Sequence, residues 1–233
     1  MKIGGLQKVS TIDYPGEICC VVFLWGCNFR CGFCHNPDLV VRDFDSGFSE
    51  EYVLDFLERR KGKLDGVCIT GGEPLVSLDF GFVRKIKAME FKVKLDTNGS
   101  FPGKLKELID LGLIDYVAMD VKSCAEDYSK VAGVSVDVSK IEESIKIIDE
   151  FGAGEFRTTV VPGLHDEKSL VEMGKWMNEV CGRKPKKFFL QGFKRGEGVI
   201  DSFFNSKREV LEKELLEMKE LLEPYFEKVD IRV

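Results

Sequence analysis

The sequence predicts an α/β fold: a partial (β/α)6 barrel of parallel strands that stays open, with helices on its outside. Short apolar runs alternate six times with helical stretches, and this alternation favours parallel strands joined by helices. The chain has 233 residues, whereas a closed eightfold barrel typically takes about 250. No linker or low-complexity segment interrupts the alternation, so we expect residues 1–233 to form a single domain.

The six predicted strands are short apolar runs rich in β-branched and aromatic residues. The first spans residues 18–25, reads ICCVVFLW and is typical of a buried strand. The other five span residues 66–70, 92–96, 115–121, 155–161 and 186–191. A last strand at residues 228–233 would end the chain.

The predicted helices follow the strands and are marked by capping residues and apolar stripes. Ser49 is a good N-cap and acidic residues follow it, which predicts a helix over 49–60. Gly152 is a typical C-cap for a helix over 139–152. Leu211, Leu215, Met218 and Leu222 form one stripe of a helix over 207–223. The remaining helices are expected at 78–89, 103–112 and 166–180.

Composition narrows the class of protein. The net charge is −6, and the basic residues are scattered, so no nucleic-acid-binding footprint is expected. No apolar run approaches the roughly 20 residues of a membrane span, and residues 1–17 lack the apolar stretch of a signal peptide. We therefore expect a cytoplasmic protein without membrane contact. In the cytosol thiols stay reduced, so the eight cysteines favour a metal or redox cofactor over disulfides.

Three of the cysteines are clustered directly after the first strand. Cys27, Cys31 and Cys34 have the spacing C-x3-C-x2-C. A [4Fe–4S] cluster is usually held by four thiolates, so three would leave one iron open for a small molecule with an amine and a carboxylate. A zinc-binding module is the alternative, because catalytic zinc takes three protein ligands plus water. Zinc would not explain the residues at the other strand ends.

Those residues are polar or glycine-rich, and each follows a predicted strand. They are TGGEP at 70–74, DTNG at 96–99, MDVK at 119–122, and Arg157 on the fifth strand. In barrels of this kind the chemistry lies at the C-terminal ends of the strands. The sequence therefore predicts one mouth that contains thiolates, glycine backbone, two acids, a lysine and an arginine.

The spacing C-x3-C-x-aromatic-C followed by GGEP resembles the radical S-adenosylmethionine (SAM) superfamily. The wider pattern comprises TIDYPG, GCNFRCGFCHNPD, TGGEP, DTNG, MDVK and VPG. This pattern is similar to the glycyl-radical-enzyme activases, and in particular to the anaerobic ribonucleoside-triphosphate reductase activating proteins. The resemblance extends from residue 1 to about residue 195.

The resemblance implies a role for each matching residue. The three cysteines would bind three irons of a [4Fe–4S] cluster, and the amino and carboxylate groups of SAM would bind the fourth. Phe33 would pack near the adenine, and the fork of Arg157 would suit the SAM carboxylate. The implied SAM-binding set is Phe33, Gly71, Gly72, Glu73, Asp96, Asn98, Asp120, Lys122 and Arg157.

The resemblance also implies the reaction and the partner. SAM would be cleaved reductively to methionine and a 5′-deoxyadenosyl radical, which would remove a hydrogen from a glycine Cα of a glycyl-radical enzyme. Anaerobic ribonucleotide reductase is the favoured partner, with an electron donor such as flavodoxin or ferredoxin. The alternative is a small-molecule radical SAM enzyme that resembles 7-carboxy-7-deazaguanine synthase.

Asp96 and Asp120 raise a question of charge. If their strands are neighbours, the two strand ends lie about 5 Å apart, and both carboxylates would face the carboxylate of SAM. Crowded like charges raise one another's pKa, so a counterion is needed. Lys122 and Arg157 are available, and the alternative is that they suffice. We hypothesise in addition a bound monovalent cation between Asp96, Asp120 and SAM.

Overall fold

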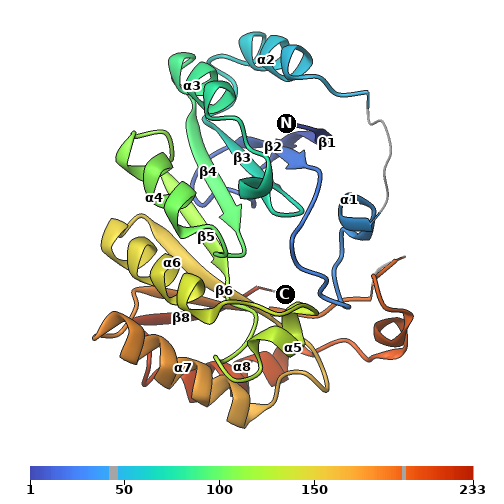
Figure 1. Cartoon of the computed structure of the whole chain (residues 1–233), viewed down its shortest axis with the longest axis vertical. Coiled ribbons are helices and arrows are strands. Elements are labelled where there is room, and N and C mark those ends of the chain that lie inside the picture. The colour runs from blue at the N-terminus through green and yellow to red at the C-terminus, as the bar shows by residue number, and fades with distance from the viewer. Residues whose placement is uncertain (42–46, 196–197, 233) are drawn as a thin grey trace. The chain divides into compact units, whose positions relative to one another are not determined.

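The computed structural model describes residues 1–41, 47–195 and 198–232. Its strands belong to one eight-stranded sheet in the order β1 to β8, with β1 and β8 at the edges (Figure 1). The predicted α/β class with an open, mostly parallel sheet is confirmed. By their contacts the residues fall into two compact units, and each is described by itself below. The first unit comprises Met1–Asn28, Asp38–Thr97 and Gly103–Val117; the second comprises Phe29–Pro37, Asn98–Pro102 and Ala118–Val233.

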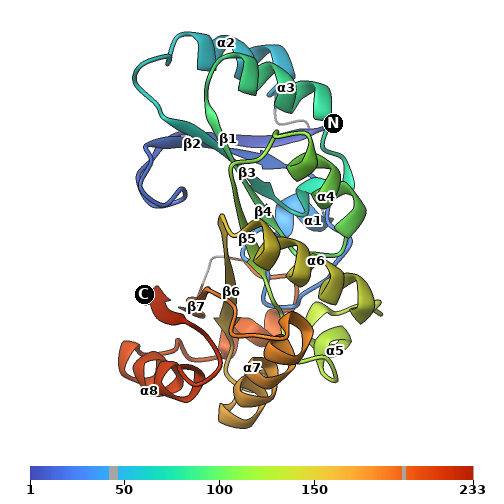
Figure 2. The same cartoon turned by 90° about the vertical axis from the view of Figure 1, so that its left-hand side faces the viewer.

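The first unit is built on four strands. They are β1 (Ile3–Ser10), β2 (Cys19–Leu24), β3 (Gly66–Gly71) and β4 (Lys92–Thr97). β1 pairs antiparallel with β2, whereas β2, β3 and β4 pair in parallel. Its helices are α1 (Pro37–Val41), α2 (Glu50–Glu58), the 3-10 helix η1 (Pro74–Val76), α3 (Phe80–Ala88) and α4 (Pro102–Asp110). Figure 2 shows α2 and α3 side by side, and α3 also packs against β4.

The second unit continues the alternation. The strand β5 (Tyr116–Asp120) ends in it, and β6 (Gly154–Val160), β7 (Lys187–Gly192) and β8 (Lys228–Arg232) pair in parallel. Its helices are α5 (Tyr128–Ala132), α6 (Val138–Phe151), α7 (Glu167–Cys181), the 3-10 helix η2 (Ser202–Ser206) and α8 (Glu212–Leu222). α6 packs against β6 and α7, and α8 packs against α7, β7 and β8 (Figure 1).

Several boundaries differ from those expected. The strand β1 was not predicted, because its residues 3–10 include two glycines and three exposed positions and show no apolar alternation. The helices α1 and α5 have five residues each, too few for a helical pattern to show. The last helix begins at Glu212 rather than at 207, and Leu211 of the predicted stripe is 63% exposed. Val233, the end of the predicted last strand, lies outside the described residues.

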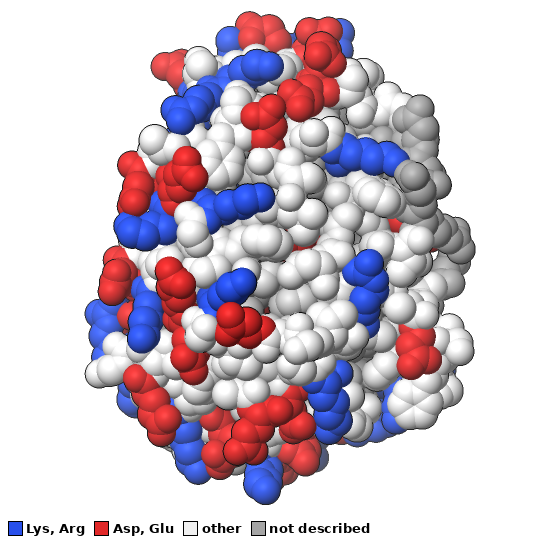
Figure 3. Space-filling model, in the orientation of Figure 1, with Lys and Arg blue, Asp and Glu red and all other residues white. Residues whose placement is uncertain are grey.

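Charge on the surface is mixed. On the face in Figure 3, basic and acidic side chains are interspersed along the edge to the left, and uncharged atoms fill much of the centre. Within the residues that the structure describes, none of the helices has the length and apolar character needed to cross a membrane.

Candidate functional site

In the first unit, the GGEP segment packs directly against the backbone that carries Cys27. Gly72 N donates to Leu24 O at 2.9 Å, and Glu73 N donates to Gly26 O at 2.8 Å. A Cβ on Gly72 would lie 2.1 Å from Gly26 O and 3.2 Å from Cys27 Cβ. Glycine is therefore required here for close backbone approach. The contact fixes the position of the first cysteine.

The Glu73 side chain is fully buried beside that contact. Its Oε1 accepts from Leu75 N at 3.1 Å and from Thr97 Oγ1 at 2.8 Å, so the carboxylate joins the start of η1 to the end of β4. A buried carboxylate that accepts two hydrogen bonds is fixed in direction. Glu73 is thus a rigid acceptor at the C-terminal edge of the strands, where the sequence predicts it.

Asp96 has a partner that the sequence analysis missed. Lys94, on the same strand, donates from Nζ to Asp96 Oδ1. Lys94 Nζ also lies 3.7 Å from Cys68 Sγ, and Cys68 Sγ lies 3.8 Å from Asp96 Oδ1. The alternation along β4 could have revealed the pair, because residues two apart on a strand share a face. Lys94 adds a positive charge beside Asp96 that the sequence pattern did not indicate, and the monovalent cation itself stays a prediction.

In the second unit, the loop that carries Cys31 and Cys34 is tied down on both sides. Arg30 N donates to Ala132 O at 2.8 Å, and Asp201 N donates to Gly32 O at 2.9 Å. Between the two cysteines, Cys34 N donates to Cys31 O at 3.0 Å and closes a tight turn. These hydrogen bonds therefore fix the backbone conformation between Cys31 and Cys34.

The aromatic residues of the loop anchor it. Phe29 packs edge-on against Tyr128 with ring centroids 6.5 Å apart, and Phe33 packs edge-on against Phe204 at 6.0 Å. Phe33 is 4% exposed. Such pairs add about 0.5–1.5 kcal/mol beyond burial. Phe33 thus has a packing role in the structure, and its contact with adenine stays a prediction.

Asp120 lies at the end of β5 between two cations. Arg157 Nε donates to Asp120 Oδ1 at 2.6 Å, and Lys122 Nζ lies 3.3 Å from Asp120 Oδ2. Burial by itself raises the pKa of Asp120, but the charges of Arg157 and Lys122 outweigh it and hold that pKa well below its usual range. Asp120 is therefore a carboxylate, and the Nε of Arg157 is directed to it rather than left for a ligand.

Cys31 lies within the electrostatic field of the same group. Burial raises the pKa of the Cys31 thiol, and the positive charge of Lys122 opposes that rise. Burial alone would lower the pKa of Lys122, but Asp120 and then the Cys31 thiolate outweigh it and raise that pKa. Lys122 thus stays protonated and partly offsets the rise that burial causes in the pKa of Cys31.

Asn98 and His165 are structural in ways that the sequence did not indicate. Asn98 Oδ1 accepts from Ser100 N at 3.0 Å and from Ser100 Oγ at 2.6 Å, so it builds the turn after β4. His165 accepts from Val161 N at its Nδ1 (3.0 Å), and its Nε2 lies 2.8 Å from Lys122 O, to which it donates. His165 thereby ties the loop after β6 to the end of β5; nothing in its sequence context distinguishes it from a loop residue.

The predicted residues are distributed over both units. The first holds Cys27, Gly71, Gly72, Glu73 and Asp96, and the second holds Phe33, Cys31, Cys34, Asn98, Asp120, Lys122 and Arg157. None of the eight cysteines forms a disulfide. Across the described ranges, no three Cys, His, Asp or Glu side chains stand together as a ready metal site. The donor chemistry of three thiols on one short loop fits an iron–sulfur cluster, and the ligand assignment itself stays a prediction.

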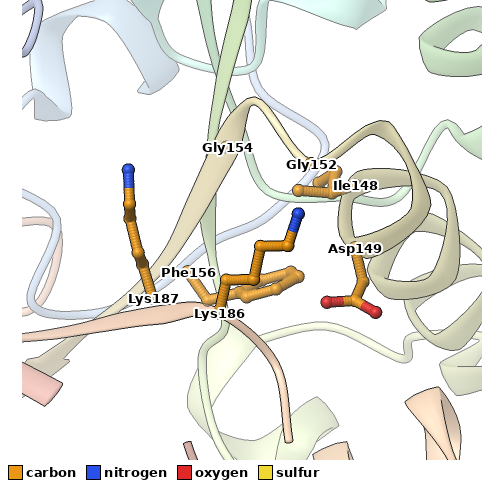
Figure 4. A pocket seen from close by; sticks show the side chains of 7 residues that line it. All are labelled: Ile148, Asp149, Gly152, Gly154, Phe156, Lys186 and Lys187. Atoms are coloured by element: carbon orange, nitrogen blue, oxygen red, sulfur yellow. The ribbon is translucent and has the colours of Figure 1, made fainter. Parts of the chain in front are cut away.

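The second unit contains a small pocket and a larger one. The pocket in Figure 4, of about 10 Å³, is lined by Ile148, Asp149, Gly152, Gly154, Phe156, Lys186 and Lys187 and includes none of the predicted residues. It has room for about one water molecule. A larger pocket of about 330 Å³ lies along the loops after β5 and β6 and is lined by residues that include Cys124, His165 and Ser169.

Comparison with known families gives one match over most of the chain. Residues 21–173 match the model of the Radical SAM superfamily. This range includes all the predicted site residues.

The relatives that match by sequence include two activating enzymes. The "Putative glycyl-radical enzyme activating enzyme MJ1227" of Methanocaldococcus jannaschii is 34% identical over 99% of this chain and 95% of its own length. The "Pyruvate formate-lyase-activating enzyme" of Clostridium pasteurianum is 30% identical over 72% of this chain and 71% of its own.

A solved structure shares the fold. The crystal structure of Streptococcus suis SuiB matches with a TM-score of 0.63 at 16% identity, and the match covers 91% of this chain. The chain spans about half the length of SuiB, 50%. The open barrel predicted from the sequence is thus confirmed as the fold of this chain.

Proposed function

Since the chain belongs to the Radical SAM superfamily, we propose that it generates a glycyl radical on a partner enzyme, with anaerobic ribonucleotide reductase as the favoured partner. The observation that carries this proposal is the likeness to a glycyl-radical enzyme activating enzyme over 99% of the chain. The partner itself rests on the sequence motifs alone.

The superfamily uses a [4Fe–4S] cluster and SAM. Cys27, Cys31 and Cys34 would hold the cluster, which when bound supplies the electron for reductive cleavage of SAM. An electron donor such as flavodoxin or ferredoxin is part of the proposal, as is action in the cytoplasm. We also propose that residues 1–233 act as one domain.

In this proposal the residues of the chain would hold the cluster, orient SAM and supply positive charge. The Gly72 contact fixes Cys27, and the ammonium of Lys122 partly offsets the rise that burial causes in the pKa of Cys31. Glu73, fixed by Leu75 N and Thr97 Oγ1, would accept from the amine of SAM. The cations of Arg157 and Lys122 exceed the charge of Asp120 by one, since two positive groups face one carboxylate. That surplus suits the SAM carboxylate.

Metal and product analysis of anaerobically purified protein tests this function. Iron and sulfide at about four each per chain, with 5′-deoxyadenosine released when SAM and a reductant are added, would support it. One zinc without sulfide would show the zinc-binding module instead. Rapid turnover only with a purine-like small molecule would favour the alternative enzyme class.

A further inference from the structure

The hydroxyl of Tyr128 is buried and unpaired. Tyr128 is the first residue of α5 in the second unit, and its side chain is fully buried. Within the described part of the chain, its hydroxyl has no hydrogen-bond partner. A buried hydroxyl without a partner keeps the full cost of leaving water, so it calls for an explanation. A group that binds beside Tyr128 would supply the missing partner.

The ring of Tyr128 is held from two sides. Phe29 of the cysteine loop (residues 29–34) packs edge-on against it with ring centroids 6.5 Å apart, and Trp176 of α7 does so at 6.1 Å. Trp176 is itself fixed, because its Nε1 donates to Glu142 Oε1 at 2.9 Å. A ring packed in this way cannot turn freely, so the fold sets the direction of the hydroxyl.

The backbones of α5 and the cysteine loop are joined as well. Arg30 N donates to Ala132 O at 2.8 Å, and a Cβ on Gly133 would lie 2.1 Å from Arg30 O. Gly133 has a φ of 71°, in the left-handed region that favours glycine. The start and the end of α5 therefore both contact the cysteine loop, and Tyr128 keeps a fixed place beside it.

The polar groups that act on the Tyr128 hydroxyl belong to the predicted site. Burial raises the pKa of Tyr128, the backbone and the ammonium of Lys122 oppose that rise, and Cys31 and Asp120 add to it. The phenol therefore stays protonated and offers a donor. Asp120 already accepts from Arg157 and Lys122. Because a coordinating thiol is deprotonated outright, metal binding would turn the sulfur of Cys31 into an anionic acceptor, which makes the stronger hydrogen bonds.

We propose that the Tyr128 hydroxyl donates a hydrogen bond to the sulfur of Cys31 when that sulfur binds the iron–sulfur cluster. The hydrogen bond stabilises negative charge on the sulfur, and the reduced cluster carries one more electron than the oxidised cluster. Hydrogen bonds to the sulfurs are among the factors that set the reduction potential of a cluster. Tyr128 thus acts through Cys31 and makes the cluster easier to reduce. This inference rests on the proposed function.

The test is the reduction potential of the reconstituted cluster, measured by an EPR-monitored redox titration without SAM or a partner enzyme. Tyr128→Phe keeps the ring and removes the hydroxyl. This variant should make reduction about tenfold less favourable, which lowers the potential by about 59 mV for one electron. An unchanged potential in Tyr128→Phe would overturn the proposal.

A matched control is available in the first unit. Tyr14 is also a buried tyrosine, and the charges that act on it most are those of Asp115 and Glu17. Tyr14→Phe removes a hydroxyl of the same kind and should keep the potential of the wild type. A shift of the same size in Tyr14→Phe would show that the effect does not depend on the place of Tyr128, and would reject the proposal.

The hydrogen bond itself is detectable by electron–nuclear double resonance on the reduced cluster in H2O and D2O. The wild type and Tyr14→Phe should show a coupled exchangeable proton that Tyr128→Phe lacks. Identical exchangeable-proton signals in the wild type and Tyr128→Phe would contradict the proposal.

Melting of the cluster-free protein distinguishes this role from a structural one. Since the hydroxyl has no partner there, Tyr128→Phe should melt at or above the temperature of the wild type. A clearly lower melting temperature, or a variant that fails to fold, would mean that the hydroxyl bonds to Asp120 or to a buried water. Either result would reject the proposal.

The failure of this inference and the failure of the proposed function are distinguishable. A chain that loads the cluster but forms no glycyl radical would overturn the proposed function, and the reduction potential would still decide on Tyr128. A chain that binds no iron would overturn both, and metal analysis identifies that case.

Discussion

The three cysteines of residues 27–34 differ in exposure: Cys31 is buried, whereas Cys27 and Cys34 are half-buried. Because a cluster needs each thiolate, replacing any one of them by alanine should abolish iron binding and SAM cleavage. Iron and sulfide analysis after anaerobic reconstitution measures this. Cys181→Ala, a half-buried cysteine on α7, is the control and should keep full iron content. Loss of iron in Cys181→Ala, or full iron in Cys34→Ala, would show that the ligands are assigned wrongly.

His165 should make stability depend on pH. Burial lowers the pKa of His165 in the folded protein, whereas the unfolded chain keeps about 6.5. Between these two values the unfolded state binds more protons. The contribution of His165 to the free energy of unfolding is therefore fully present above about pH 6.5. As the pH falls below that value, the free energy of unfolding decreases, by at most about 1.4 kcal/mol per pH unit for this group.

Urea unfolding of the cluster-free protein at several pH values between 5 and 8 would measure the effect. His165→Gln keeps a side chain that can donate to Lys122 O but removes the titration, so its unfolding midpoint should fall less with acid than that of the wild type. A wild type and a His165→Gln variant with parallel pH dependence would show that His165 does not contribute.

Within the elements, two glycines allow a matched comparison. In Gly72→Ala a Cβ would collide with Gly26 O at 2.1 Å, so the segment after β2 must shift and Cys27 with it. In Gly103→Ala, in the first turn of α4, the Cβ meets nothing within 4 Å. Gly103→Ala should be neutral or stabilising by up to about 1 kcal/mol, since alanine favours helices.

Thermal melting and iron content together check this pair. Gly72→Ala should lower the melting temperature and reduce the bound iron, and Gly103→Ala should do neither. If Gly72→Ala melts and loads iron like the wild type, the close contact between GGEP and the Cys27 segment is not required.

Elements with a strong pattern could be predicted from the sequence, and weak ones could not. The helix 139–152 was expected within one residue of α6, because Ile141, Ile145 and Ile148 mark its buried face and Gly152 its end. The strand β1 gains its place from hydrogen bonds with β2, which no periodicity in residues 3–10 reveals. The extra five residues expected before α8 carry the right residue types, but the backbone there is not helical.

The same contrast holds for the candidate site. Motif spacing indicated Cys27, Cys31, Cys34 and the strand-end acids. It could not give the pairings, because Arg157 on β6 and Asp120 on β5, which form an ion pair, are 37 residues apart in the chain. Lys94 carries no motif, and a single lysine within an apolar strand does not show from its spacing that its side chain is buried. The tie between His165 and Lys122 O depends on two loops that meet only in the fold.

At the scale of the whole molecule, the proposed function is the generation of a radical on a glycine of another protein. The most direct test mixes the reconstituted protein with SAM, a reductant and anaerobic ribonucleotide reductase and records the EPR spectrum. We expect a glycyl radical signal whose hyperfine splitting collapses when the partner carries α-deuterated glycine. Release of 5′-deoxyadenosine without such a signal on this or any other glycyl-radical enzyme, together with faster release on a small molecule, would contradict it.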